Sequence, residues 1–254
     1  MADPGNDRLD PDRLLQTLEQ AQSDARRGRL RIYFGACAGV GKTYAMLAAA
    51  RAQAAQGVDV VAGLVETHGR ADTAALLDTL PALPLQTLDF QGRRLREFDL
   101  QATVARRPRL LLLDELAHTN APGARHAKRW QDVEELLAAG IDVWTTLNVQ
   151  HLESLNEAVG GITGVRVRET VPDSVFDAAD EIILVDLSAD ELLRRLREGR
   201  VYVPEQARHA SRHFFRKGNL IALRDAITIE APRVAPLPRA GRARLDQALA
   251  LAET

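Results

Sequence analysis

A glycine-rich segment that joins an apolar run to an alanine-rich run carries the clearest chemical signal in the sequence. Residues 35–43 read GACAGVGKT. Gly39 and Gly41 let backbone N–H groups turn toward an anion without a Cβ in the way, and a helix expected to begin near Lys42 adds the positive end of its dipole. The pattern is a relaxed P-loop, because Ala36 stands where the strict motif has glycine. We therefore predict a phosphate cradle made of Ala36, Cys37, Ala38, Gly39, Val40, Gly41, Lys42 and Thr43.

Two side chains of this cradle have predicted roles toward a nucleotide and a metal ion. Lys42 is expected to reach the β- and γ-phosphates of ATP, and the hydroxyl of Thr43 is expected to bind Mg²⁺. Cys37 is the single cysteine of the chain. We interpret it as a small filler residue, because nothing else in the sequence supports a redox role.

An acidic pair follows a second apolar run. Residues 110–115 read LLLLDE. In a P-loop protein, an aspartate at the end of such a strand holds the hydration shell of Mg²⁺, so Asp114 is predicted to share the metal with Thr43. Glu115 is a candidate general base that polarises a water or a hydroxyl for attack on the γ-phosphate. Glu66, which follows the apolar run 58–65, competes for the same catalytic role.

Polar residues also follow the apolar run 141–145. Thr146 and Asn148 are predicted to bind the nucleotide by sensing its γ-phosphate, as in ATPases whose sheet has an extra inserted strand. The alternative interpretation is that they cap a helix over 149–159. Both interpretations remain open at this point.

Strands alternating with helices must position these residues. Such alternation predicts a parallel sheet covered by helices on both faces, with ligands at the carboxyl ends of the strands. We therefore expect an α/β fold of the P-loop NTPase type, with a C-terminal helical extension broken near Gly218. The predicted strands are 30–34, 58–65, 109–113, 141–145 and 181–185, with a short one at 85–90. The predicted helices are 13–27, 43–56, 72–80, 128–139, 149–159, 189–198 and 205–230.

Composition narrows the class of protein. The chain has 254 residues, of which 46% are hydrophobic and 27% charged, and its net charge is −2. This balance gives no electrostatic footprint for nucleic acid, and no apolar run approaches the roughly 20 residues of a membrane-spanning helix. The polar, acidic residues 1–12 do not have the pattern of a signal peptide. We expect a cytoplasmic protein without direct membrane insertion.

These residues lie in longer stretches that resemble the N-terminal domain of the KdpD family of potassium-responsive sensor histidine kinases. The matching stretches cover roughly residues 29–227. They are GACAGVGKTYAML (35–47), VETHGR (65–70), LLDELAHTNAPG (112–123), KRWQDVEELLAAGIDVWTTLNVQHLESLN (128–156), VPDSVFDAADEIILVDL (171–187), VYVPEQA (201–207) and FFRKGNLIALR (214–224). Ala38 departs from the family pattern, which commonly has proline there. The departure should loosen the loop slightly without removing a phosphate contact.

The resemblance implies three segments and a regulatory function. The segments are a tail and helix over 1–28, a nucleotide-binding domain over 29–230, and a linker with a C-terminal stub over 231–254. The domain would bind ATP and adjust the kinase and phosphatase activities of a two-component receptor that controls potassium uptake. Its implied partners are other domains of that receptor, including a stress-protein-like domain, or a separate histidine kinase. The chain would be either a fragment of such a receptor or a short stand-alone relative.

Two further functions stay open beside this one. The chain could be a catalytic P-loop enzyme, either an ATPase or a phosphotransferase that acts on a protein hydroxyl. A DNA-dependent motor is disfavoured by the balanced charge and the missing helicase motifs. Several basic residues could stabilise transition-state charge, although a solvated basic face is the ordinary explanation for most of them. They are His68, Arg70, Arg125, His126, Lys128, Arg129, Arg216 and Lys217.

Overall fold

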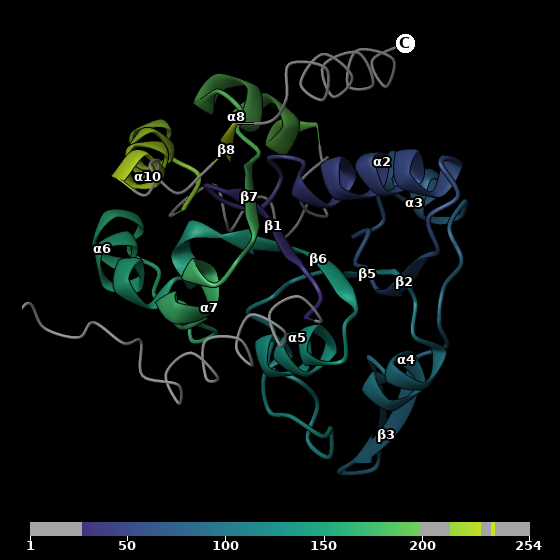
Figure 1. The fold of residues 1–254 in the computed structure, drawn as a ribbon. Coiled ribbons are helices and arrows are strands. Elements are labelled where there is room, and N and C mark those ends of the chain that lie inside the picture. Colours follow the sequence, from purple (N-terminus) through teal and green to yellow (C-terminus); the bar gives the residue numbers. More distant parts are fainter. Residues whose placement is uncertain (1–26, 199–213, 230–234, 237–254) are drawn as a thin grey trace, which may run out of the picture.

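A parallel β-sheet covered by helices forms the centre of the computed structural model, which describes residues 27–198, 214–229 and 235–236. The strand order is β2-β5-β6-β1-β7-β8, and every pairing in this sheet is parallel. Helix α2 packs on one face of the sheet and α5 on the other, as Figure 1 shows. The predicted α/β class is therefore confirmed.

Strands and helices alternate along most of the chain, apart from one hairpin and two places where several helices follow one another. The strands of the large sheet are β1 (Leu30–Gly35), β2 (Val60–Leu64), β5 (Leu110–Leu113), β6 (Asp142–Asn148), β7 (Glu181–Leu184) and β8 (Ala235–Pro236). The first helices are α2 (Lys42–Ala55), α3 (Ala71–Leu77), α4 (Leu100–Arg106) and α5 (Arg129–Ala138). The later helices are η1 (Val149–His151), α6 (Glu153–Thr163), α7 (Asp173–Asp177), α8 (Ala189–Arg197) and α10 (Lys217–Ile229).

The apolar runs became the central strands because they are buried on both faces. All four leucines of β5 are buried, and β1 is buried at five of its six positions. Strands enclosed in this way read as continuous hydrophobic runs and not as alternating ones. The predicted strands at 30–34, 58–65, 109–113, 141–145 and 181–185 are all present within a few residues of these bounds.

The middle of the chain contains a unit that the sequence pattern only partly indicated. The predicted short strand at 85–90 corresponds to β3 (Gln86–Phe90), but it pairs antiparallel with β4 (Arg93–Glu97) in a separate two-stranded sheet. Neither β4 nor α4 was predicted. The arginine-rich sequence of β4 lacks the apolar character that marks a strand, and α4 spans seven residues, too few for a clear periodicity.

One predicted boundary was wrong, and two further predictions concern the C-terminal part. The predicted helix 149–159 starts as the 3₁₀ turn η1 and is interrupted at Leu152, whose backbone is extended, so α6 begins at Glu153. The predicted break near Gly218 is present: residues 214–216 are not helical, and α10 begins at Lys217. Ala235–Pro236 forms β8 within the segment 231–254, which was predicted as a linker with a C-terminal stub. Proline is tolerated there because β8 lies at an edge of the sheet.

Some predictions fall on residues outside the described ranges. Residues 13–26 of the expected helix 13–27 belong to this group, as do residues 205–213 and 230 of the expected helix 205–230. Among the described helices, none has the length and apolar character needed to cross a bilayer.

Candidate functional site

The predicted phosphate cradle lies between the end of β1 and the start of α2. Gly39 and Gly41 adopt φ angles of 88° and 99°, in the left-handed region that favours glycine. Gly41 is the residue at the N-terminal cap of α2, and no side chain caps this helix. The first turn of α2 also contains no acidic residue. Its positive end therefore faces the cradle uncompensated by protein groups, which is the arrangement that binds phosphate.

Strand β6 lies between β1 and β5, and its polar end connects the cradle to the acidic pair. Thr146 and Asn148 belong to the strand itself, and Asn148 pairs in register with Gly35. The hydroxyl of Thr146 donates a hydrogen bond to Oδ1 of Asp114, and the side-chain oxygen of Asn148 accepts one from Lys42. Asn148 makes no capping hydrogen bond with its side chain. The capping interpretation of these residues is therefore not supported.

The two predicted metal ligands are adjacent. Oγ1 of Thr43 donates a hydrogen bond to Oδ2 of Asp114 over 3.1 Å. Backbone N–H groups of Glu115 and Glu66 also donate to the Asp114 carboxylate, at 3.1 and 3.4 Å. The carboxylate is therefore held by groups from four segments of the chain. A hydroxyl and a carboxylate in contact, both beside a phosphate cradle, fit Mg²⁺, which takes one or two protein oxygens and completes its shell with phosphates and water.

Burial changes the ionisation of both central charges. Burial lowers the pKa of Lys42 to about 8, although the negative charge of Asp114 acts in the opposite direction. Burial raises the pKa of Asp114, while hydrogen bonds from Thr146 and Thr43 act in the opposite direction. Lys42 also donates a 2.9 Å hydrogen bond to the carbonyl oxygen of Cys37. A polyanionic ligand with a divalent cation would supply each of these buried charges with a partner of opposite sign.

The two candidate bases differ in how they are held. Glu115 has a φ of 58°, an uncommon conformation for this residue type, and its carboxylate lies 3.6 Å from Nε2 of His68. The hydrogen bond from His68 lowers the pKa of Glu115, and the same contact raises the pKa of His68. Glu66 is exposed. Glu115 is therefore the carboxylate that the fold positions at the site.

Arg129 is buried and therefore does not belong to a solvated basic face. Its side chain is 1% exposed, and it donates hydrogen bonds to the backbone oxygen of Asp114 at 2.8 Å and to Glu97 at 3.0 Å. Burial alone would raise the pKa of Glu97, but hydrogen bonds from His118, Phe98 and Ala121, together with the charge of Arg129, lower it to about 2. This buried pair joins the end of β5, at Asp114, to the β3–β4 unit.

The remaining basic candidates lie in different places. Arg125 and His126 both pair with Glu135, at 3.1 and 2.8 Å. Lys128 donates to Thr119. Lys217 pairs with Asp190 of α8 at 2.7 Å, and Arg216 precedes it at the start of α10. His68, Arg70 and Arg129 of this group lie near the acidic pair.

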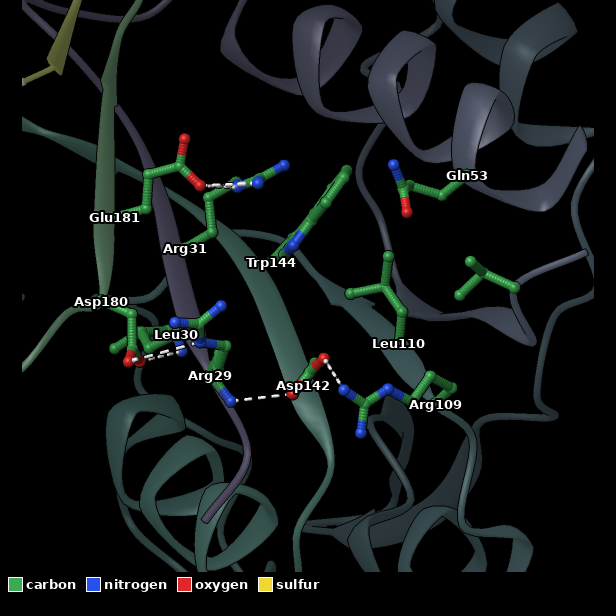
Figure 2. Close-up of a pocket in the computed structure, with 11 residues that line it drawn as sticks. Arg29, Leu30, Arg31, Gln53, Arg109, Leu110, Asp142, Trp144, Asp180 and Glu181 are labelled. Atoms are coloured by element: carbon green, nitrogen blue, oxygen red, sulfur yellow. Dashed lines mark hydrogen bonds and ion pairs between the residues drawn. The ribbon is translucent and has the colours of Figure 1, made fainter. Parts of the chain in front are cut away.

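A cavity of about 490 Å³ lies at the opposite edge of the sheet, at the amino ends of the strands. Figure 2 shows its charged side chains directed at one another. Arg31 pairs with Glu181 at 2.6 Å and stacks on the ring of Trp144, and Arg109 pairs with Asp142 at 3.3 Å. Ligands of parallel α/β sheets bind at the carboxyl ends of the strands, so this cavity is distinct from the candidate site.

Comparison with known proteins identifies the family. The KdpD family model, described as the osmosensitive K⁺ channel His kinase sensor domain, matches residues 26–234. This chain belongs to the KdpD family. It is 62% identical over 236 residues to the sensor protein KdpD of Escherichia coli K12, covering 92% of the chain and 26% of that protein. It is 52% identical over 229 residues to the sensor protein KdpD of Clostridium acetobutylicum, covering 90% of the chain and 25% of that protein.

A third KdpD relative is shorter. The putative sensor protein KdpD of Synechocystis is 52% identical over 200 residues, which are 79% of this chain and 54% of that protein. The chain thus spans about a quarter of the length of the first two relatives and about half of the third. The resemblance found in the sequence is confirmed as family membership.

Proposed function

We propose that this KdpD-family chain binds Mg²⁺–ATP in the cradle Ala36–Thr43 and that the bound nucleotide regulates a sensor histidine kinase. The observation that carries the proposal is the contact between Thr43 and Asp114, at the open N-terminus of α2. Phosphates would lie on the N–H groups of the cradle, with Lys42 at the β- and γ-phosphates. Thr43 and Asp114 would hold Mg²⁺, which when bound neutralises part of the phosphate charge.

The regulatory part of the proposal follows from the relatives. Two of them bear the name sensor protein KdpD and are about four times as long as the matching region. We propose that this chain likewise acts with the domains of a receptor, or with a separate histidine kinase, in a two-component system for potassium uptake. It would work on the cytoplasmic side, where ATP is supplied. A stress-protein-like domain is one further proposed partner.

A chimeric receptor tests the regulatory function. This chain would replace the matching quarter of the E. coli relative, to which it is 62% identical. We expect the chimera to respond to potassium, and we expect Lys42→Ala to change the ratio of its kinase and phosphatase activities. Arg51→Ala, which removes an exposed positive charge from the same helix, is the matched control. Equal activity ratios in the chimera and its Lys42→Ala variant would contradict regulation by nucleotide.

The position of Glu115 favours a second candidate function, phosphoryl transfer to water or to a protein hydroxyl. Its carboxylate is 44% exposed, stays ionised because His68 lowers its pKa, and adjoins the proposed metal ligand Asp114. Single-turnover incubation with γ-labelled ATP separates the candidates. Label that stays on ATP supports a purely regulatory site, whereas label on phosphate or protein supports catalysis. Glu115→Gln should then abolish transfer, and Glu66→Gln should leave it intact.

A further inference from the structure

A buried arginine on α8 adds a cation to the candidate site that none of the motifs includes. The buried face of α8 consists of Ala189, Leu192, Arg195 and Leu196. Arg195 has a relative exposure of only 7%. Arginine is almost never buried to this extent without partners of opposite charge. The apolar stripe of α8 therefore includes one buried charge, which forms an ion pair with the partly exposed Glu191 of the same helix.

The guanidinium of Arg195 is directed at the phosphate cradle. A Cβ added to Gly41 would lie 4.0 Å from Nη1 of Arg195, which places this nitrogen beside the backbone of the cradle. Among the described residues, Nε of Arg195 donates a hydrogen bond to the carboxylate of Glu191 at 3.1 Å. Glu191, one turn earlier on α8, therefore orients the guanidinium, while Nη1 lies beside Gly41 at the start of α2.

Three cations converge on this small region from different elements. Lys42 opens α2, Arg70 lies in the loop after β2, and Arg195 comes from α8. Burial lowers the pKa of Arg70, and repulsion from Arg195 lowers it further, whereas Asp72 and Asp114 oppose the change. Positive charges that repel one another beside an uncapped helix N-terminus are compensated most simply by a bound polyanion.

We propose that Arg195 is a nucleotide-binding residue that contacts the α- or β-phosphate of the nucleotide bound in the cradle. The proposal rests on the proposed function and adds a residue to its site. Gly41 lies in the part of the loop whose N–H groups surround the α- and β-phosphates, whereas Lys42 serves the β- and γ-phosphates. An arginine approaching at Gly41 therefore recognises ADP as well as ATP. Its planar fork suits two phosphate oxygens at once.

The same contact would connect the nucleotide to the C-terminal part of the fold. Asp190 of α8 pairs with Lys217 at the start of α10, at 2.7 Å. Asp186, which precedes α8, binds Arg224 of α10 through two nitrogens. A nucleotide that holds Arg195 therefore also fixes α8, the helix against which α10 is paired. Figure 1 shows α8 and α10 together at one side of the sheet.

Parallel titrations with ATP and ADP test the proposal. The variants are Arg195→Ala, Arg195→Lys and the control Arg197→Ala, which removes an exposed charge from the same helix. We expect Arg195→Ala to weaken ATP and ADP equally, by roughly ten- to hundredfold, as loss of a charge-assisted contact does. Arg195→Lys should recover part of the lost affinity, because lysine keeps the positive charge but lacks the paired N–H donors of the guanidinium. Arg197→Ala should bind both nucleotides like the wild type.

Each other outcome overturns a specific statement. Wild-type affinities in Arg195→Ala would exclude the contact while leaving the proposed function standing. A loss confined to ATP would place Arg195 at the γ-phosphate and contradict the assignment. A wild-type chain that binds neither nucleotide would overturn the proposed function and this contact together. If Arg195→Ala is less stable without ligand, equal affinities of the stable Arg195→Lys variant and the wild type would likewise exclude the contact.

Discussion

Oγ1 of Thr43 lies 3.1 Å from Oδ2 of Asp114, although the two residues are 71 positions apart in the chain. Thr43 lies in the first turn of the helix after β1, and Asp114 directly follows β5, with β6 between these strands. Thr146 of the intervening strand donates to the same carboxylate. The geometry therefore brings the hydroxyl and the carboxylate together at one point, where a divalent cation would find two protein oxygens.

This arrangement predicts a magnesium-dependent effect of Asp114→Asn. The substitution removes the negative charge that would hold the metal, but it keeps the shape of the side chain. We expect affinity for Mg²⁺–ATP to fall far more than affinity for ATP measured with a chelator present. Calorimetric titration under both conditions gives the comparison. Equal losses with and without Mg²⁺ would show that Asp114 acts in the fold and not on the metal.

The parts of the candidate site that come from short continuous segments could be predicted from the sequence. The cradle occupies eight consecutive residues, and Asp114 follows directly after four leucines, so each is visible as a short motif. The position of β6 between β1 and β5, which brings Thr146 and Asn148 to the site, comes from the sheet order and was not predicted. Sequence order alone does not fix strand order in a sheet, because helical crossovers allow several arrangements.

Long-range polar contacts could not be predicted in this way. Glu97 and Arg129 form a buried pair across 32 positions, and nothing in the arginine-rich sequence around Glu97 marks it as buried. Arg195 did have a signal, because it interrupts the apolar stripe of α8 at Leu192 and Leu196. A charged residue on the buried face of an amphipathic helix is an indication of a functional or structural partner elsewhere in the fold.

The Glu97–Arg129 pair predicts a pH-dependent contribution to stability. Glu97→Gln leaves Arg129 charged and buried without its carboxylate, which should reduce the free energy of unfolding by about 3–5 kcal/mol near neutral pH. The pKa of Glu97 in the folded chain is about 2, below its ordinary value of 4.5. The contribution is therefore complete above about pH 4.5 and is lost as the pH falls toward 2.

Chemical denaturation at pH 7 and at pH 3.5 measures this effect. The difference between wild type and Glu97→Gln should be smaller at the lower pH. Arg106→Gln is the matched control, because it breaks an exposed ion pair with Asp59 and should have a much smaller effect. Similar losses for the two variants would contradict the structural role assigned to the buried pair.

Cys37 should be chemically inert in the folded protein. It is fully buried, and burial raises the pKa of its thiol to about 12. Because the thiolate is the reactive form, alkylation at pH 8 should be more than about a hundredfold slower than in the unfolded chain. It is the single cysteine, so total thiol modification reports on it directly. Rapid modification of the native protein would restore a redox role for this residue.

Helix α10 should differ between the nucleotide-bound and empty states. It pairs with α8 through Lys217 and with Asp186, just before α8, through Arg224, and α8 carries Arg195 at the cradle. We expect slower hydrogen exchange across 217–229 when a non-hydrolysable ATP analogue is bound, because binding would restrict α8. Lys42→Ala, exposed to the same analogue, is the control. Unchanged protection in the wild type would exclude α10 as the responding element.

The central claim is that the chain binds ATP through this cradle, and the most direct measurement is a calorimetric titration with Mg²⁺–ATP of three proteins: wild type, Lys42→Ala and Arg51→Ala. Lys42 is buried at the cradle, whereas Arg51 is exposed on the same helix. We predict a single binding event whose affinity falls roughly ten- to hundredfold in Lys42→Ala and is unchanged in Arg51→Ala. Equal affinities in Lys42→Ala and the wild type, or no binding by the wild type, would contradict the account.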